Sequence, residues 1–70
     1  YYVIEVKYTR NDRVYIREEQ KEALIQQSEK FGAIPVIAVK FKGKRNWEFY
    51  DARKVDNIIR MDQKGNLKLI

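Results

Sequence analysis

Glu5 and Lys7 are the two residues of this sequence best suited to act together in a reaction. They lie two positions apart in Ile4-Glu5-Val6-Lys7, within a β-branched and aromatic segment that is typical of a strand. Because side chains alternate between the faces of a strand, the carboxylate and the ammonium group point to the same side. Hydrolysis of a phosphodiester gives each group a task. The carboxylate helps to hold a divalent ion that polarises the phosphate and generates hydroxide, while the lysine orients the water or stabilises negative charge. A solvent-facing pair on an edge strand is the simpler alternative, and these residues alone leave it open.

The segments around this pair predict an α/β fold in which one helix packs on a mixed sheet. We expect strands at residues 1–8, 34–41 and 46–51, and a helix at 17–31. Between the first strand and the helix we expect a turn at 11–12 and a short extended or helix-entry piece at 14–16. The last strand is expected to be followed by a helical turn within 51–56 and a terminal hairpin with arms 58–61 and 66–70 around the turn 62–65. The nearly continuous apolar run at 34–41 is typical of a strand covered on both faces, as in a parallel pairing. With 70 residues, the chain makes one domain at most.

The apolar rows within these elements indicate which side chains form the core. On strand 1–8, the row opposite Glu5 and Lys7 is expected to be buried, namely Tyr2, Ile4, Val6 and Tyr8. The expected inner face of the helix holds Leu24, Ser28 and Phe31, continued by Gln20 and Gln27. Gly32 is expected just after the end of the helix. We interpret the aromatic residues Phe31, Trp47 and Phe49 as core or dimer contacts rather than as groups that stack on bases.

The composition is that of a soluble globular protein, with 44% hydrophobic and 36% charged residues. The longest apolar run, residues 33–39, is far shorter than the ~20 residues of a membrane helix, so we expect no membrane and a cytoplasmic location. The sequence contains no cysteine and no histidine, which excludes zinc sites built from thiolates or imidazoles. Any metal is therefore expected to be held by carboxylates and waters, which favours magnesium or a similar hard ion.

The cationic residues form two blocks, although the net charge of +5 is modest. One block contains Lys40, Lys42, Lys44 and Arg45 with no acid among them, and the other contains Lys7, Arg10, Arg13 and Arg17, diluted only by Asp12. Clustering of this kind favours a polyanion as partner. A solvated surface explains charge blocks equally well.

The stretch IEVKYTRNDRVYIREEQKEALIQQSEKFGAIPVIAVKF, followed by WEFY, resembles the archaeal Holliday-junction resolvase family, a branch of the PD-(D/E)xK nucleases. That family shows a strand ending in E-V-K, a basic turn, a Y-V/I entry into a helix, an F-G-G/A helix end, a strand ending in V-K-F, and W-x-F. The likeness covers residues 3–51 in the same order and spacing. It implies a restriction-endonuclease-like core, cleavage of four-way DNA junctions with Mg²⁺ or Mn²⁺, and a two-fold homodimer with paired active sites.

The resemblance also implies roles for individual residues. Glu5 corresponds to the metal-binding acid of the family motif and Lys7 to its catalytic lysine. Lys40, at the end of the V-K-F strand, is expected beside the site or on a phosphate, and its alternative is a lysine whose stem packs on the sheet. Gln20 matches a helix glutamine of some relatives in the nuclease superfamily, which implies a place near metal-bound water. Its position one turn before Leu24 favours the border of the core instead.

The remaining implied residues concern DNA. Arg10 and Arg13 are expected in the basic turn near the DNA, and Lys42, Lys44 and Arg45 either grip phosphates or keep their turn soluble. Family members also carry an acid on an N-terminal helix and an aspartate on a strand before E-V-K, and nothing here precedes Tyr1. We therefore expect a fragment or processed product, a truncated nuclease domain over residues 1–70 that is catalytically incomplete as given. A non-catalytic nucleic-acid-binding or assembly module that retains the nuclease sheet is the alternative.

Overall fold

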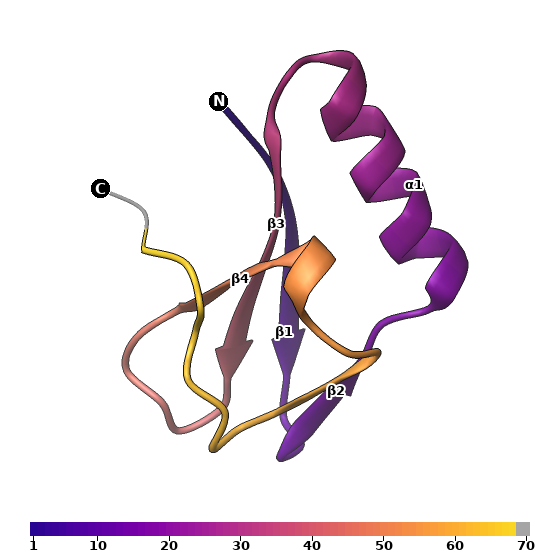
Figure 1. Ribbon diagram of the computed structural model, residues 1–70. Helices are drawn as coiled ribbons and strands as arrows, with labels where there is room; N and C mark the ends of the chain where they lie inside the picture. Colours follow the sequence, from indigo (N-terminus) through magenta and orange to yellow (C-terminus); the bar gives the residue numbers. More distant parts are fainter. Residues whose placement is uncertain (69–70) are drawn as a thin grey trace.

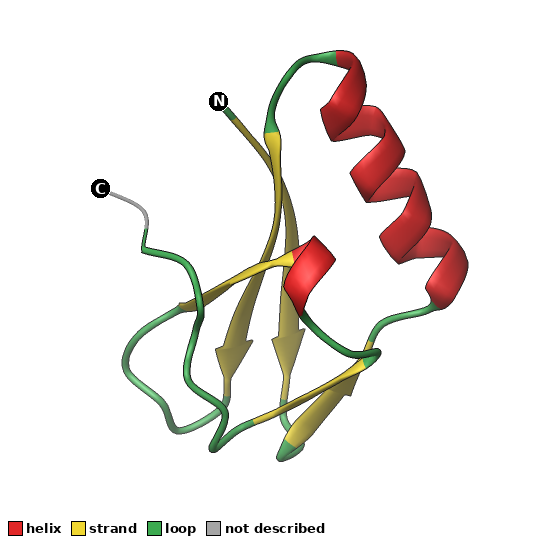
Figure 2. Ribbon diagram, viewed as in Figure 1, coloured by secondary structure: helices red, strands yellow, loops and turns green. Residues whose placement is uncertain are grey.

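The order of elements along the chain is largely the predicted one (Figures 1 and 2). The computed structural model describes residues 1–68. Its elements are strand β1 (Tyr2–Thr9), strand β2 (Arg13–Tyr15), helix α1 (Glu18–Lys30), strand β3 (Ile34–Phe41), strand β4 (Glu48–Asp51), the 3₁₀ turn η1 (Ala52–Lys54) and strand β5 (Ile58–Arg60). The predicted strands, helix and helical turn up to residue 56 are confirmed to within two residues.

The main sheet has the strand order β1–β3–β4 and is mixed, as predicted. β1 and β3 are parallel over eight register pairs, from Tyr2↔Ile34 to Thr9↔Phe41. β4 runs antiparallel to β3. Parallel neighbours need a crossover connection, and α1 supplies it, lying beside the β1–β3 pair in Figure 1. Strands β2 and β5 form a separate antiparallel ribbon.

Helix α1 presents a narrow stripe to the sheet. Leu24 and Ser28 are buried as predicted, and the stripe is completed by the half-buried Lys21 and Ile25, at i, i+3, i+4 and i+7 spacing. Lys21 Nζ donates to Val55 O at 2.7 Å. Gly32 follows the helix with a φ of 62°, a conformation that favours glycine and confirms the predicted helix end.

Three residues assigned to the inner face of this helix lie elsewhere. Gln20 and Gln27 are exposed, so the prediction that they continue the buried face is wrong. Phe31 is 67% exposed and does not belong to the core either. It is the C-cap residue, with φ −104° and ψ 4°, so the backbone has already left the helical path and its side chain no longer follows the helical face.

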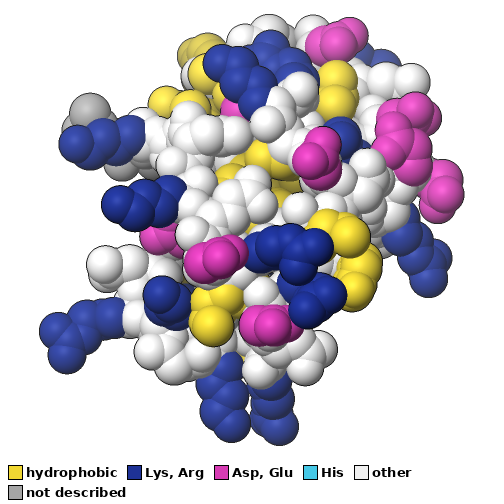
Figure 3. Space-filling view, turned by 60° about the horizontal axis from the view of Figure 1, so that its bottom comes forward, with side chains coloured by type: hydrophobic (Ala, Val, Ile, Leu, Met, Phe, Trp, Pro, Cys, Tyr) yellow, Lys and Arg dark blue, Asp and Glu magenta, His cyan; other side chains and the backbone are white. Residues whose placement is uncertain are grey.

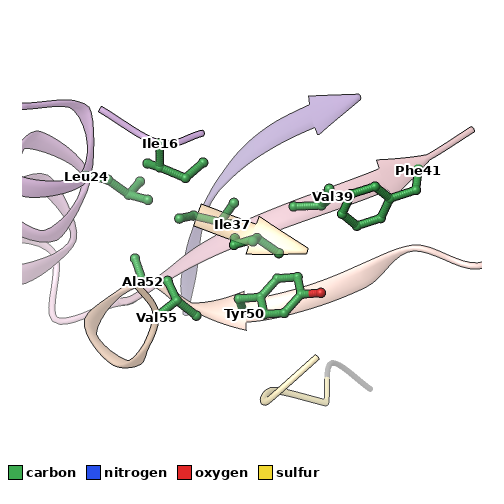
Figure 4. Close-up of a cluster of buried hydrophobic side chains, with 9 residues drawn as sticks. Ile16, Leu24, Ile37, Val39, Phe41, Tyr50, Ala52 and Val55 are labelled. Carbon is green, nitrogen blue, oxygen red and sulfur yellow. The ribbon is translucent and has the colours of Figure 1, made fainter. Parts of the chain in front are cut away.

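The core fills the space between α1, one face of the sheet and the η1 region (Figure 4). Its buried cluster consists of Ile16, Leu24, Ile37, Val39, Phe41, Tyr50, Ala52, Val55 and Ile59. β3 supplies three of these side chains, β4 supplies Tyr50 and η1 supplies Ala52. Burial of each large apolar side chain is worth about 1.5–3 kcal/mol. β3 is buried on both faces, as its continuous apolar run predicts.

The predicted inner face of β1 is the wrong one. Tyr2, Ile4, Val6 and Tyr8 are exposed at 45%, 45%, 60% and 61%, whereas the row of Val3, Glu5, Lys7 and Thr9 is half-buried. The reason is that α1 and the core cluster lie over the row of Val3, which packs against that cluster. Within residues 1–68, β1 is an edge strand and no helix covers its other face.

The predicted terminal hairpin is also wrong. β5 pairs with β2, residues 66–68 form no strand, and residues 69–70 lie outside the described part of the chain. The segment that follows β5 instead runs along β4, where Leu67 N donates to Phe49 O at 3.2 Å. Gly65 is needed there because a Cβ atom would lie 2.7 Å from Phe49 O. The glycine thus serves a close approach of two backbones rather than a hairpin turn.

Candidate active site on strand β1

The structure places Glu5 and Lys7 on one face of β1, as the spacing predicts. Both are half-buried, and their register partners on β3 are Ile37 and Val39, two residues with 0% exposure. The carboxylate and the ammonium group therefore stand at the border of the apolar core, on the side of the sheet that α1 covers. Because their neighbour β3 is buried on both faces, the strand that carries them is held in a fixed register.

Glu5 carries the most informative atom of the site. Its Oε2 is buried and has no hydrogen-bond partner. A buried polar atom without a partner costs about 1–3 kcal/mol, and more when it is charged, so folded proteins contain few of them. Within residues 1–68, neither Glu5 nor Lys7 takes part in an ion pair. Binding of a cation by Glu5 Oε2 would explain why this buried oxygen has no hydrogen-bond partner.

The donor set near Glu5 fits a hard cation only in part. Magnesium in nucleases is usually held by one or two carboxylates together with waters and phosphate oxygens. Among residues 1–68 there is no group of three or more acidic, histidine or cysteine side chains that could hold a metal. Glu5 can therefore supply one oxygen ligand, but within residues 1–68 it is not part of a group of three or more such donors.

Two other acids near this end of the sheet are engaged elsewhere. Glu48 pairs in register with Val39, so it shares the face of Lys7, but its Oε1 accepts a hydrogen bond from Gly65 N at 2.7 Å. Asp12 accepts from Arg13 Nε at 3.1 Å, and the Arg13 guanidinium holds the pKa of that carboxyl below its ordinary value. Neither carboxylate completes a site around Glu5.

Lys40 lies on the face opposite to Lys7. Its register partner on β1 is Tyr8, so it shares the exposed row of that strand. Its Nζ donates to Lys44 O, which ties the side chain to the basic turn after β3. The structure thus groups Lys40 with this turn rather than with Glu5 and Lys7.

The basic turn of residues 42–45 meets the end of β1. Lys42 N donates to Thr9 O at 2.9 Å, and Lys44 N donates to Phe41 O at 3.0 Å. Gly43 has a φ of 87°, a left-handed conformation that glycine adopts freely. The three cationic side chains of this turn, Lys42, Lys44 and Arg45, are exposed.

The other predicted cations cluster at the same end. Arg10 directly follows β1 and is exposed, and Arg13 opens β2. Figure 3 looks onto this end of the molecule and shows Lys and Arg side chains spread over it. Gln20, by contrast, is exposed and off the buried stripe of α1, so the reading that places it at the border of the core is wrong.

Arg60 is a cationic residue at this end that sequence reasoning missed. The β2–β5 pairing sets it directly opposite Arg13. These positions are far apart in the chain, and the turn-forming residues 62–65 favour a local hairpin instead. No local signal in the sequence points to the pairing.

The mixed sheet with one helix packed on it defines an α/β domain. Its fold is similar to that of a solved structure, the Holliday junction resolvase Hjc of the archaeal hyperthermophile Archaeoglobus fulgidus, with a TM-score of 0.73 and 23% sequence identity. That similarity covers 84% of this chain and 52% of the other, so this chain spans about half of the length of that relative. The sequence also matches the model of the archaeal Holliday junction resolvase (Hjc) family over residues 1–68, and the chain belongs to this family.

Proposed function

We propose that this chain carries the Glu5–Lys7 part of the active site of an endodeoxyribonuclease that cuts four-way DNA junctions with Mg²⁺ or Mn²⁺. The observation that carries the proposal is the buried, unpartnered Glu5 Oε2 beside Lys7 on a fixed strand. Family membership supports the choice of junction DNA as substrate. Such an arrangement costs stability and is typical of a site that is completed by a ligand.

The roles of the two residues follow from their chemistry. Glu5 would hold the divalent ion, which when bound supplies Lewis-acid polarisation of the phosphodiester and activates water. Lys7 lies two positions after Glu5 on the same face of β1. Its ammonium group would stabilise the negative charge that develops on the phosphate oxygens. The apolar partners Ile37 and Val39 keep both side chains pointing into one space, which fixes the geometry of the pair.

Junction recognition is proposed to rest on the phosphate backbone. The cationic residues Arg10, Arg13, Lys42, Lys44 and Arg45 lie in the segments that follow β1 and β3, and Lys7 lies two residues before β1 ends. Figure 3 shows Lys and Arg side chains over this end of the molecule, with Asp and Glu side chains among them. Phosphate contacts position a protein on DNA without reading bases. A two-fold homodimer with two such sites would suit the two symmetric cuts that a junction requires. Within residues 1–68, no helix is long and apolar enough to span a membrane.

The present chain is proposed to need a further acid for cleavage, because the described residues contain no group of three or more donors that could hold a metal ion. We expect the 70-residue chain alone to bind magnesium weakly and to cut no junction. A chimera in which this chain replaces the matched part of the Archaeoglobus fulgidus Hjc protein tests the active form. Symmetric nicking by the chain alone that Glu5→Gln removes would overturn the expected incompleteness.

The test of the proposed activity uses that chimera, a labelled four-way junction and Mg²⁺. Lys7→Ala should abolish cleavage while junction affinity stays within a few-fold, because a group that acts in the transition state contributes little to ground-state binding. Lys30→Ala, an exposed lysine at the far end of α1, is the matched control and should cut normally. Near-normal cleavage by Lys7→Ala would refute the assignment. Binding without cleavage by the parent chimera would favour a non-catalytic DNA-binding module.

A further inference from the structure

The ribbon of β2 and β5 holds two arginines side by side. Arg13 and Arg60 are direct register partners. The hydrogen bonds at both ends of the ribbon show which kind of pair they form: Met61 N donates to Asp12 O, and Ile16 N donates to Asn57 O, each at 2.7 Å. Hydrogen-bonded and non-hydrogen-bonded pairs alternate along an antiparallel ladder, so Arg13 and Arg60 are a non-hydrogen-bonded pair. In such pairs the Cα atoms lie only about 4.5 Å apart and the side chains are closest.

Two like charges in this position work against the ribbon. Like charges directly opposite each other on a sheet are destabilising. Asp12 offsets them in part, because its carboxylate pairs with Arg13 at 3.1 Å and both arginines lower its pKa, Arg13 more than Arg60. Within residues 1–68, the Arg60 guanidinium forms no ion pair. Because the Arg13–Arg60 pair destabilises the ribbon, a contribution to fold stability does not explain it, whereas binding of an anion would.

The core fixes the direction in which both arginines point. Val14 packs against the core cluster, and Ile59 and Ile16 belong to it with 0% and 2% exposure. Because side chains alternate along a strand, Arg13, Tyr15 and Arg60 occupy the opposite, outer face of the ribbon. Tyr15 is 63% exposed there. Two guanidinium groups next to an exposed aromatic ring make a surface suited to a nucleic-acid strand, where arginine binds phosphate and an aromatic ring packs on a sugar or base.

We propose that the outer face of the β2–β5 ribbon is a second DNA-contact surface, in which Arg13 and Arg60 hold one phosphate between them and Tyr15 packs against the adjacent nucleotide. A phosphate in this position replaces the repulsion between two like charges with charge-assisted hydrogen bonds to both. The proposal rests on the proposed junction substrate, and it adds Arg60 and Tyr15 to the residues that touch DNA.

The position of the ribbon favours a DNA backbone over a single acidic group as the occupant. Three residues separate the end of β1 from the start of the ribbon, and the basic turn 42–45 is hydrogen-bonded to that same end, where Lys42 N donates to Thr9 O. The ribbon and the turn thus lie at one end of the molecule, over which Figure 3 shows many Lys and Arg side chains with some Asp and Glu side chains among them. Several separated cations suit repeated phosphates, whereas one carboxylate would engage only one of them.

The test measures binding of a labelled four-way junction at several salt concentrations, without divalent ions, together with thermal unfolding of the free protein. The chain itself and its R60Q, R60E and Y15A variants are compared with Lys30→Gln as the charge-matched control. R60Q should weaken binding about tenfold and reduce the slope of log affinity against log salt by about 0.9, the value for one lost phosphate contact. Y15A should weaken binding with little change in slope, because it removes packing rather than charge.

R60E separates DNA binding from a structural role. It sets an acid opposite Arg13, so the free protein should unfold at an equal or higher temperature while junction affinity falls further than in R60Q. A lower unfolding temperature together with weaker binding would overturn the proposal, since Arg60 would then act through the fold. If the parent protein binds junctions, and R60Q binds them with the same affinity and the same salt dependence, the ribbon is not a DNA-contact surface. The proposed function would be unaffected by that result. Failure of the parent protein to bind junctions would refute the proposed function and, with it, this inference.

Discussion

Replacement of Glu5 by methionine should stabilise the fold while it removes the proposed metal ligand. Glu5 Oε2 is buried and has no partner within the described residues. An apolar side chain of similar length keeps the contacts of the stem and removes a polar atom that the fold does not satisfy. When a buried polar group is replaced by an apolar one of the same shape, stability is often unchanged or improved.

The size of the effect follows from the state of that one atom. An unsatisfied buried polar atom costs about 1–3 kcal/mol. Glu5 as a whole is only half-buried, so the lower part of this range applies, and we expect Glu5→Met to raise the free energy of unfolding by about 1 kcal/mol. For a domain of this size, that corresponds to a rise of roughly 4–8 °C in Tm.

Glu48 provides a matched control on the same face of the sheet. It is also half-buried, but its Oε1 accepts a hydrogen bond from Gly65 N at 2.7 Å. Glu48→Met removes that acceptor and leaves the Gly65 N–H without its partner, so stability should fall by about 1–2 kcal/mol. The two substitutions are chemically identical and are expected to change the unfolding temperature in opposite directions.

Thermal and urea unfolding followed by circular dichroism, in metal-free buffer, measure both variants. The reasoning fails if Glu5→Met lowers Tm as much as Glu48→Met does. That result would show that the Glu5 carboxylate is satisfied within the folded chain, and its use as a metal ligand would lose its structural support.

Three further outcomes are expected. Replacing the three cations of the turn 42–45 by glutamine should reduce the slope of log junction affinity against log salt concentration by about 0.9 per lost phosphate contact. An unchanged slope would mean that the turn only aids solubility. Tyr50→Phe should lower the free energy of unfolding by about 1 kcal/mol in urea titrations, because the buried hydroxyl, whose pKa burial raises to about 12, donates to Gln63 O at 2.7 Å. Asp51 has a pKa below its ordinary value, chiefly because the Arg53 side chain donates to its carboxylate, so its contribution to stability is complete above about pH 3.9 and is lost as the pH falls through the lower, folded value. Asp51→Asn should therefore weaken the loss of Tm between roughly pH 5 and pH 2, and an unchanged acid profile would contradict this.

The faces of β1 mark one limit of prediction from sequence. Alternation correctly separates Glu5 and Lys7 from Ile4 and Val6, because it is a property of any extended chain. It does not determine which row the helix covers. Which row is covered depends on the side from which α1 crosses the β1–β3 pair. In β1 the helix covers the more polar row, which carries the proposed catalytic groups, so the apolar character of the other row predicts the wrong inner face.

The ribbon marks a second limit. The strands up to residue 51 were predictable because β-branched runs and their turns are local signals, and the family motif lies in the same stretch. The partner of β5 is not a local property, since β2 lies more than 40 positions earlier, with Tyr15 opposite Ile58. Gly65 was read as a turn residue, although it is required by the approach of the Phe49 backbone. Arg60 could therefore not be assigned to the cationic surface in advance.

The register of the β1–β3 pair has a consequence for how the protein is made. Every pair joins positions 32 apart, from 2 with 34 to 9 with 41, so the strand with the acid and lysine is synthesised well before its partner. On the ribosome this segment must wait, with its apolar side chains unshielded, until the helix and β3 have emerged. Non-local parallel pairing of this kind forms slowly. Residues 2–9 therefore stay unpaired in the main sheet until residues 34–41 have been made.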